Sequence, residues 1–187
     1  MAAPQTSTRA GAARKPAVYR KLATPAAATR PRPLLFYSHD RGVNEFVHQI
    51  SEASPMELVD VERRGVQGVF LKDLARSLDL TALRVFDMLG VPKATAEKKV
   101  LAGELVSGSG GQAAIGLARL IGKAQDMVAN STAPEAKDFD AARWLGRWIE
   151  TPQPALGGRK PSELLDTPTG LEVVLRLLGS LESGAYQ

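Results

Sequence analysis

Residues 112–129 read "QAAIGLARLIGKAQDMVA", and this stretch decides how the chain folds. Its apolar residues recur in steps of three and four, at Ala113, Leu117, Leu120, Ala124, Met127 and Val128. That spacing predicts an α-helix of about four to five turns with a long apolar seam. The rest of the sequence shows no convincing alternation of apolar and polar residues and no long-period repeat. The sequence therefore predicts an all-α fold.

Upstream of this helix, the chain reads as a run of short helices from residue 56 onwards. The segment "TALRVFDML" begins at Thr81, a suitable N-cap, and is expected to place Leu83, Phe86 and Leu89 on one stripe. Gly90 ends that helix. A further helix, "KATAEKKVLAG", follows Pro92, and "LVSGSGG" at 105–111 is interpreted as a flexible turn. Residues 34–55 are expected to form a short amphipathic helix closed by Pro55, with a linker.

The two helices that meet at Gly90 match a helix-turn-helix in length and turn chemistry. Lys93 and Thr95 lie near the start of the second helix and are placed to meet base edges. Lys98 and Lys99 suit phosphates or bases further along. The alternative is a solvated helix of a small bundle, because Glu97 sits among these lysines and weakens the basic face.

Downstream, residues 131–138 read as a polar linker and "FDAARWLGRWIE" at 139–150 as another helix. The next twenty residues, 151–170, are rich in proline and glycine. Their "GGRKP" lacks the spacing of a phosphate-binding loop, and Pro161 stands where such a loop needs a backbone donor. The segment is therefore interpreted as a stiff double turn that aims the last helix.

The last helix is expected to begin with Thr167 as its cap and Pro168 in its first turn. One stripe of it is apolar, at Leu171, Val174, Leu175, Leu178 and Leu181. Val173 and Leu177 extend the apolar surface to a second face. Such a helix is either buried or binds something, and the prediction favours a second copy or a partner protein over simple core packing.

The charge is concentrated at the N-terminus of the chain. The net charge is +4, yet residues 1–39 hold seven basic and no acidic residues, which leaves 17 of the 24 basic residues against all 20 acidic ones. Residues 1–33 have almost no large apolar residue, so they are predicted to be a disordered basic tail. It could be a solubilising tail, upstream sequence ahead of a true start at Met56, or an arm with sequence-independent affinity for DNA.

Catalysis is not expected from these residues. The two histidines, His39 and His48, lie far from any other candidate group, and no metal-ligand cluster, nucleophile elbow or Walker pattern occurs, so neither metal nor cofactor is predicted. The chain has no cysteine, which suits a reducing cytosol. With no membrane-length apolar run and no signal peptide, the expected location is the cytoplasm, without a membrane partner.

Residues 148–186 closely resemble the toxin-binding domain of the Xre/MbcA/ParS antitoxins. The resemblance rests on an ordered series of positions: Trp148, Ile149, Pro152, Pro154, Leu156, Gly157, Gly158, Pro161, Leu164, Leu165, Thr167, Gly170 and Gly184. The upstream part, from "ELVDVERRG" through "LGVPKATAEKKVLAGEL", resembles the Xre-type helix-turn-helix region of the same family. The resemblance implies a DNA-binding and dimerisation region at 56–130 and a toxin-binding domain at 131–187.

The resemblance also implies a function. Antitoxins of this kind neutralise RES-domain toxins, which consume NAD or transfer ADP-ribose, by obstructing the active site, and they bind their own promoter, usually as dimers. The expected toxin-facing residues lie in the last helix and the tail, at Gly170, Val174, Arg176, Leu177, Glu182, Gly184 and Tyr186. The family's reading helix commonly carries arginines where this chain has "KATA" and "EKK". The alternative is a stand-alone helix-turn-helix regulator whose C-terminal helices only dimerise.

Overall fold

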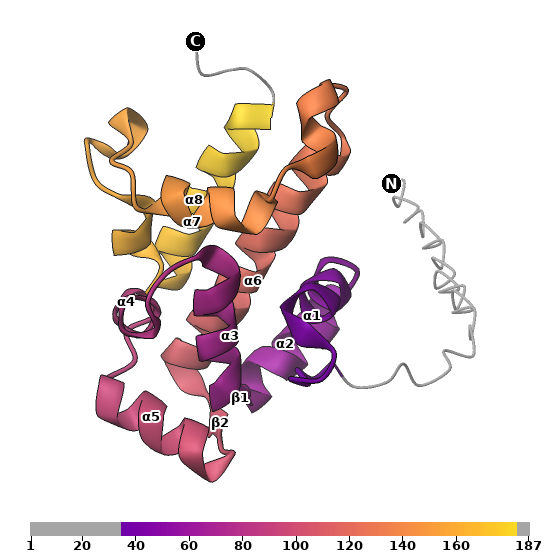
Figure 1. Cartoon of the computed structure of the whole chain (residues 1–187). Helices are drawn as coiled ribbons and strands as arrows, with labels where there is room; N and C mark the ends of the chain where they lie inside the picture. The colour runs from indigo at the N-terminus through magenta and orange to yellow at the C-terminus, as the bar shows by residue number, and fades with distance from the viewer. Residues whose placement is uncertain (1–34, 183–187) are drawn as a thin grey trace, which may run out of the picture. The chain divides into compact units, whose positions relative to one another are not determined.

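The computed structural model describes residues 35–182, and the basic tail predicted at 1–33 lies outside this part (Figure 1). The described elements are α1 (Gly42–Ser51), α2 (Pro55–Arg64), β1 (Val66–Gln67), α3 (Gly68–Leu78), α4 (Ala82–Met88), α5 (Lys93–Ala102), β2 (Leu105–Val106), α6 (Gly108–Ala129), α7 (Ala141–Ile149) and α8 (Pro168–Glu182). Short 3-10 turns occupy Pro134–Asp138, Pro154–Leu156 and Pro161–Leu164. The predicted all-α fold is confirmed.

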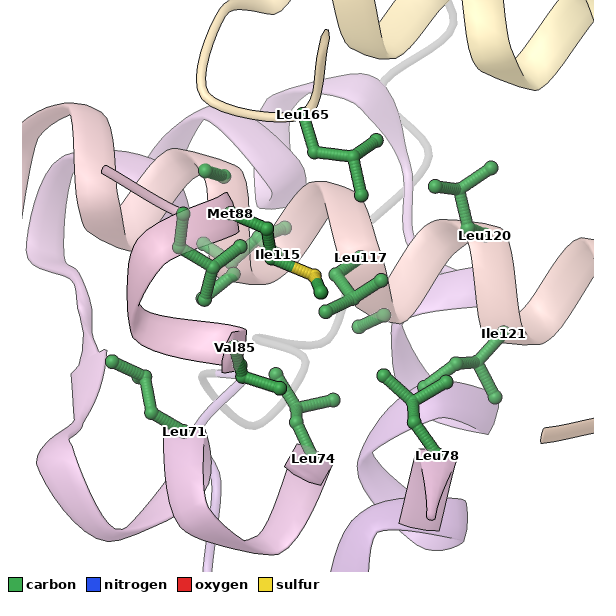
Figure 2. Packing of buried hydrophobic residues seen from close by; sticks show 14 of the residues in the cluster. Leu71, Leu74, Leu78, Val85, Met88, Ile115, Leu117, Leu120, Ile121 and Leu165 are labelled. Atoms are coloured by element: carbon green, nitrogen blue, oxygen red, sulfur yellow. The ribbon is translucent and has the colours of Figure 1, made fainter. Parts of the chain in front are cut away.

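The long helix α6 is the centre of the core. It packs against α1, α2, α7 and α8. Its side chains Ile115, Leu117, Leu120 and Ile121 are completely buried, and Figure 2 shows Ile121 beside Leu78 of α3. One hydrophobic cluster runs through the described chain, so the segments 56–130 and 131–187 share a core. Their division into separate functional regions stays a prediction.

Glycines let neighbouring helices approach α6 closely. A Cβ atom at Gly116 would lie 2.2 Å from Cδ2 of Leu171 on α8. A Cβ atom at Gly122 would lie 2.3 Å from Oγ of Ser51 at the end of α1. Because real Cβ atoms do not come that close to other heavy atoms, the two glycines make room for these contacts.

The expectation of a flexible turn at 105–111 is wrong. Leu105 and Val106 pair with Gln67 and Val66 in a two-stranded antiparallel ladder, and α6 begins at once at Gly108. A Cβ atom at Gly111 would lie 2.5 Å from the carbonyl oxygen of Val106, so close packing explains a glycine inside the helix. Two-residue strands are too short to show an alternating pattern, which is why the sequence indicated no strand.

Two further expectations need correction. Pro55 does not close the first helix, which ends at Ser51; it begins α2, where Ser54 forms a capping box with Glu57. In α4, Leu83 does not share the buried stripe and is 47% exposed, whereas Val85 and Met88 are buried beside Phe86.

Helices α4 and α5 lie within the segments predicted for them. The Thr81 side chain accepts a hydrogen bond from the backbone N–H of Arg84, as expected of an N-cap. Gly90 has a φ of 65°, which glycine adopts at little cost, and it turns the chain towards α5. Helix α5 then runs from Lys93 to Ala102, and the left-handed conformation of Gly103 ends it.

Most of the apolar stripe of α8 packs on α6, so core packing accounts for that stripe. Val173 remains 37% exposed, and contact of this second face with a partner stays a prediction. Leu171, Val174, Leu177 and Leu178 are at most 8% exposed. A terminal helix of a small domain has few neighbours that can cover it completely. Small residues along α6, such as Gly116, provide a surface close enough to cover it.

Candidate functional site

The start of α8 is fixed by its own cap and by the turn before it. The Oγ1 atom of Thr167 accepts a hydrogen bond of 3.1 Å from the N–H of Gly170, which confirms the predicted cap. A Cβ atom at Gly170 would lie 2.0 Å from the carbonyl oxygen of Leu164, so the helix lies directly on the Pro161–Leu164 turn. The direction of α8 therefore depends on residues 161–167.

The proline- and glycine-rich segment is a closed double turn, as predicted. Gly157 and Gly158 have φ values of 66° and 82°, which reverse the chain. The N–H of Gln153 donates to the carbonyl of Arg159, and the N–H of Gly158 donates to the carbonyl of Gln153, each at 3.0 Å. These bonds close the loop on itself and leave the Arg159 side chain exposed.

A polar junction joins this segment to α4 and α7. Arg84 donates to Glu150 at 2.7 Å and to the buried Oγ of Ser162 at 2.9 Å. Lys160 reaches the other carboxylate oxygen of Glu150 at 3.3 Å. The four residues are spread over 78 sequence positions, so no local pattern could have revealed the junction. It holds the base of the double turn against the two helices.

The junction sets the protonation of Glu150. Burial alone raises the pKa of this carboxyl, but the hydrogen bond and charge of Arg84, with the bonds from Lys160 and Ser162, outweigh burial and lower the pKa below its ordinary value of 4.5. A lowered folded-state pKa stabilises the fold above the unfolded pKa, and this stabilisation is lost as the pH falls through the folded pKa.

We expect Glu150→Gln to destabilise the chain at pH 7 by about 1 kcal/mol, because Arg84 loses a charged acceptor. The difference from wild type should shrink as the pH falls below the ordinary pKa of Glu150. Urea unfolding at several pH values measures it. A matched Glu163→Gln variant, at an exposed carboxylate, should track the wild type, and a pH-independent difference at Glu150 would contradict the assignment.

Of the seven predicted toxin-facing residues, Arg176 is exposed on α8. Gly170, Val174 and Leu177 are buried and support the helix from beneath. The side chain of Glu182, together with Gly184 and Tyr186, lies outside the described residues. Beside Arg176, the outer face of α8 exposes Thr169, Glu172 and Val173, which are not among those seven residues. Contact of the seven residues with a toxin stays a prediction.

The predicted DNA-binding residues on α5 divide into two groups. Lys93, Thr95 and Lys98 are exposed on the outer surface. The ammonium group of Lys99 is turned back instead, donating to the carbonyl of Leu105 at 2.7 Å and lying 3.7 Å from a carboxylate oxygen of Glu104. The structure therefore leaves three of the four predicted side chains exposed and holds the ammonium group of the fourth against β2.

A buried carboxylate on α3 was missed by the sequence reasoning. Asp73 is 5% exposed, accepts a hydrogen bond from Tyr37, and lies 2.7 Å from Nδ1 of His39. Arg76 lies 2.7 Å from the other carboxylate oxygen, in ion-pair contact but not in hydrogen-bond geometry. Burial, then the hydrogen bond and charge of Asp73, raise the pKa of Tyr37. The sequence signal that could have revealed it is the position of Asp73 between the apolar residues Leu71 and Leu74.

This cluster anchors the segment that precedes α1. The ring of Tyr37 packs against Phe46 and Phe70, with centroids 5.7 and 4.5 Å away. Arg64 donates to the carbonyl of Leu35 at 2.7 Å. In the part of the chain that the structure describes, no three acidic or histidine side chains gather into a group that could hold a metal ion. Through Tyr37 and His39, the carboxylate of Asp73 ties the segment before α1 to α3.

The C-terminal part also carries an aromatic surface. Trp144 stacks on Trp148 with centroids 6.1 Å apart, and Phe139, which is 43% exposed, lies 6.2 Å from Trp144. Phe139 and Trp144 line an apolar pocket of about 350 Å³ with Met127 and Val128 of α6. The helix predicted at 139–150 begins only at Ala141, so Phe139 precedes α7 and is half exposed.

Comparison with known proteins gives two matches. Residues 138–184 match the family described as the antitoxin Xre/MbcA/ParS C-terminal toxin-binding domain. A relative from Sphingobium sp. (strain YBL2), named Prs ADP-ribosylating antitoxin, is 37% identical over 147 residues, which cover 78% of this chain and 91% of the relative. The matched domain contains the double turn, the polar junction residues Glu150, Lys160 and Ser162, and α8. Within residues 35–182, no helix is long and apolar enough to cross a membrane.

Proposed function

The chain belongs to the Xre/MbcA/ParS-type antitoxins, and from this membership we propose that it neutralises a cognate RES-domain toxin by obstructing the toxin's active site and represses its own operon. Its general role is that of an antitoxin in a toxin–antitoxin system. The proposal concerns the kind of toxin, the way it is blocked, and the binding of promoter DNA in the cytoplasm.

The observation that carries the toxin-binding proposal is the exposed outer face of α8. The inner face of the helix is fixed on α6, and its first turn is fixed on residues 161–167. The outer face, from Thr169 through Val173 to Arg176, is therefore presented by a rigid support. A preorganised helix loses little conformational entropy on binding, which favours a tight complex.

The chemistry of this face fits an enzyme that handles NAD. The relative from Sphingobium is named for an ADP-ribosylating system, and we extend that property of the toxin to the partner of this chain. The Arg176 guanidinium offers several donors in a rigid plane and would pair with an acidic group at the toxin's cleft. Val173, which is 37% exposed, adds an apolar contact one turn away.

The test is charge reversal on this face. We expect Arg176→Glu to weaken the complex with the toxin encoded beside this gene by about tenfold or more, and to reduce growth rescue, because a central arginine is replaced by an acid. Binding is measured with the two purified proteins. Arg147→Glu, which reverses an exposed arginine on α7, is the control and should bind as wild type. Equal affinities for the two variants would remove Arg176 from the interface.

Promoter binding is proposed for α5, supported by its exposed Lys93, Thr95 and Lys98 side chains. We expect a Lys93→Ala/Lys98→Ala chain to bind promoter DNA more weakly, with the slope of log affinity against log salt reduced by about two, since each phosphate contact contributes about 0.9. Lys99→Ala is the control and should keep the wild-type slope, because its amine is held by Leu105. Identical slopes for all three chains would contradict the proposal.

A homodimer is also proposed. Two copies related by a twofold axis would present α5 twice, at a spacing that suits a palindromic operator. Sedimentation of the full chain, alone and with the toxin, measures the number of copies. A chain that stays monomeric at all concentrations, with and without promoter DNA, would contradict this part of the proposal.

A further inference from the structure

The exposed face of α5 has an unusual composition for a DNA-facing helix. Ala94, Lys98 and Leu101 are four and three residues apart, so they lie along one face of the helix, opposite the completely buried Ala96. Leu101 is 87% exposed, more than any other large apolar residue in the described chain. Lysine therefore stands at the centre of this face, with an apolar side chain one turn away on either side.

Neighbouring contacts remove the other charged groups of α5 from this face. The carboxylate of Glu97 is bound by Lys72 of α3 at 2.7 Å, and the amine of Lys99 is bound by the carbonyl of Leu105. Of the charged groups of α5, Lys98 is left on this face, with Lys93 at the helix start. Glu104 borders the face beside Ala94 and Lys98, and its carboxylate lies 3.7 Å from the ammonium group of Lys99. The electrostatic complement of the face is a polyanion with apolar groups close to its charges.

A second copy of the chain fits this face less well. A twofold contact through this face would use the same surface of both copies. Because Lys98 lies at the centre of the face, the two Lys98 side chains would lie near one another. Like charges at the centre of an interface oppose association. The apolar contribution would be limited to Ala94 and Leu101 of each copy. The charge pattern therefore favours nucleic acid over a second protein chain.

The major groove of DNA supplies both features that the face requires. Phosphates and the acceptors of guanine suit lysine, and the C5 methyl group of thymine is the apolar group that the base edges present. Ala94 and Leu101 are seven residues apart, about 10 Å along the helix axis. That length corresponds to about three base-pair steps.

We propose that α5 reads its operator through thymine methyl groups, with Leu101 and Ala94 as the contacting side chains and Lys98 between them. The inference rests on the proposed promoter binding and adds which groups of the DNA are recognised. Sequence preference then comes mainly from apolar contacts, since the helix carries no arginine to form a bidentate bond with guanine.

Thymine methyl groups can be removed without changing base pairing. A duplex of the DNA directly upstream of the gene is synthesised with thymidine or with deoxyuridine, and its affinity for the full chain is measured for both forms. The wild type should bind the deoxyuridine duplex at least about fourfold more weakly, the ratio expected for one methyl-sized apolar contact. Single thymine replacements then locate the positions that matter.

The Leu101→Ala chain tests whether this residue makes the contact. It should bind the thymidine duplex more weakly than wild type and show a smaller ratio between the two duplexes. Leu83→Ala, which truncates another exposed leucine on α4, is the matched control and should keep the wild-type ratio. Because both duplexes are measured with every chain, a change in DNA shape on loss of the methyl groups affects each chain alike.

Three results would overturn the inference: equal binding of both duplexes, an unchanged ratio in Leu101→Ala, or no binding of either duplex. If the wild type binds both duplexes equally, or Leu101→Ala keeps the full wild-type ratio, thymine methyl groups are not read by this residue, although promoter binding stands. If Leu101→Ala instead dissociates a dimer and leaves the ratio unchanged, the face contacts a second copy. If the wild type binds neither duplex, the promoter-binding part of the proposed function fails as well. Failure of methyl-group recognition alone is distinguished from this result because the wild type then still binds DNA.

Discussion

A chain that ends at Thr167 is expected to lose its fold, and not only its contact with a toxin. It lacks α8, whose Leu171, Val174 and Leu178 side chains are at most 7% exposed. Each large apolar side chain lost from a core costs about 2–5 kcal/mol, and a whole domain is stable by only about 5–15 kcal/mol. Thermal unfolding followed by circular dichroism should show no cooperative transition at the wild-type temperature.

A chain that ends at Glu182 is the matched control for this truncation. It keeps the whole of α8 and removes residues 183–187, which include the predicted toxin contacts Gly184 and Tyr186. We expect it to unfold at the wild-type temperature. Weaker toxin binding by this folded chain would assign residues 183–187 to the interface. Toxin affinity equal to that of the wild type would show that these residues do not contribute to binding. A stable, cooperative fold in the chain ending at Thr167 would contradict the packing described for α8.

The sequence predicted the helices well because their signals are local. The apolar spacing of α6, the Thr81 cap of α4 and the Gly103 stop of α5 each depend on residues within a turn or two. The cap at Thr167 and the double turn before it were also predicted, because their signals are local as well. In each case the side chain or glycine that determines the conformation lies inside the segment that it shapes.

The errors arise where a distant neighbour decides the outcome. The glycines at 108–111 indicate a loop by composition, but they begin α6. Val106 pairs with the distant Val66, and its carbonyl oxygen then occupies the space that a side chain at Gly111 would need. The apolar stripe of α8 suggests from sequence alone that its side chains lack a covering surface. In the structure, Gly116 of α6 leaves the space that the Leu171 side chain occupies. The distances between these partners along the chain leave no periodic signal.

The candidate site shows the same division. The family resemblance is confirmed by the family model that matches residues 138–184, whereas the toxin-facing residues within that segment stay a prediction. The resemblance could not separate exposed from buried members, so Val174 and Arg176 were predicted alike although only the second reaches the surface. Lys99 was similarly grouped with Lys98, because its hydrogen bond to Leu105 depends on the return of the chain after Gly103.

A substitution at Gly170 can distinguish a role in the fold from direct contact with the toxin. We expect Gly170→Ala to destabilise the chain by about 3 kcal/mol or more, because the added Cβ would lie 2.0 Å from the carbonyl oxygen of Leu164, and backbone cannot yield as a flexible side chain does. Chemical unfolding of the purified chain measures this. Toxin affinity should fall in proportion to the loss of folded protein.

The control lies in the same helix. At Gly179, an added Cβ would meet only the Cε atom of Lys123, at an ordinary contact distance of 3.7 Å. Gly179→Ala should therefore leave stability unchanged or raise it by up to about 1 kcal/mol, since alanine favours the helix over glycine. If Gly170→Ala unfolded like Gly179→Ala but still lost toxin binding, Gly170 would be a contact residue. If both variants matched the wild type in stability and toxin binding, α8 would not lie as tightly on the Pro161–Leu164 turn as the described packing requires.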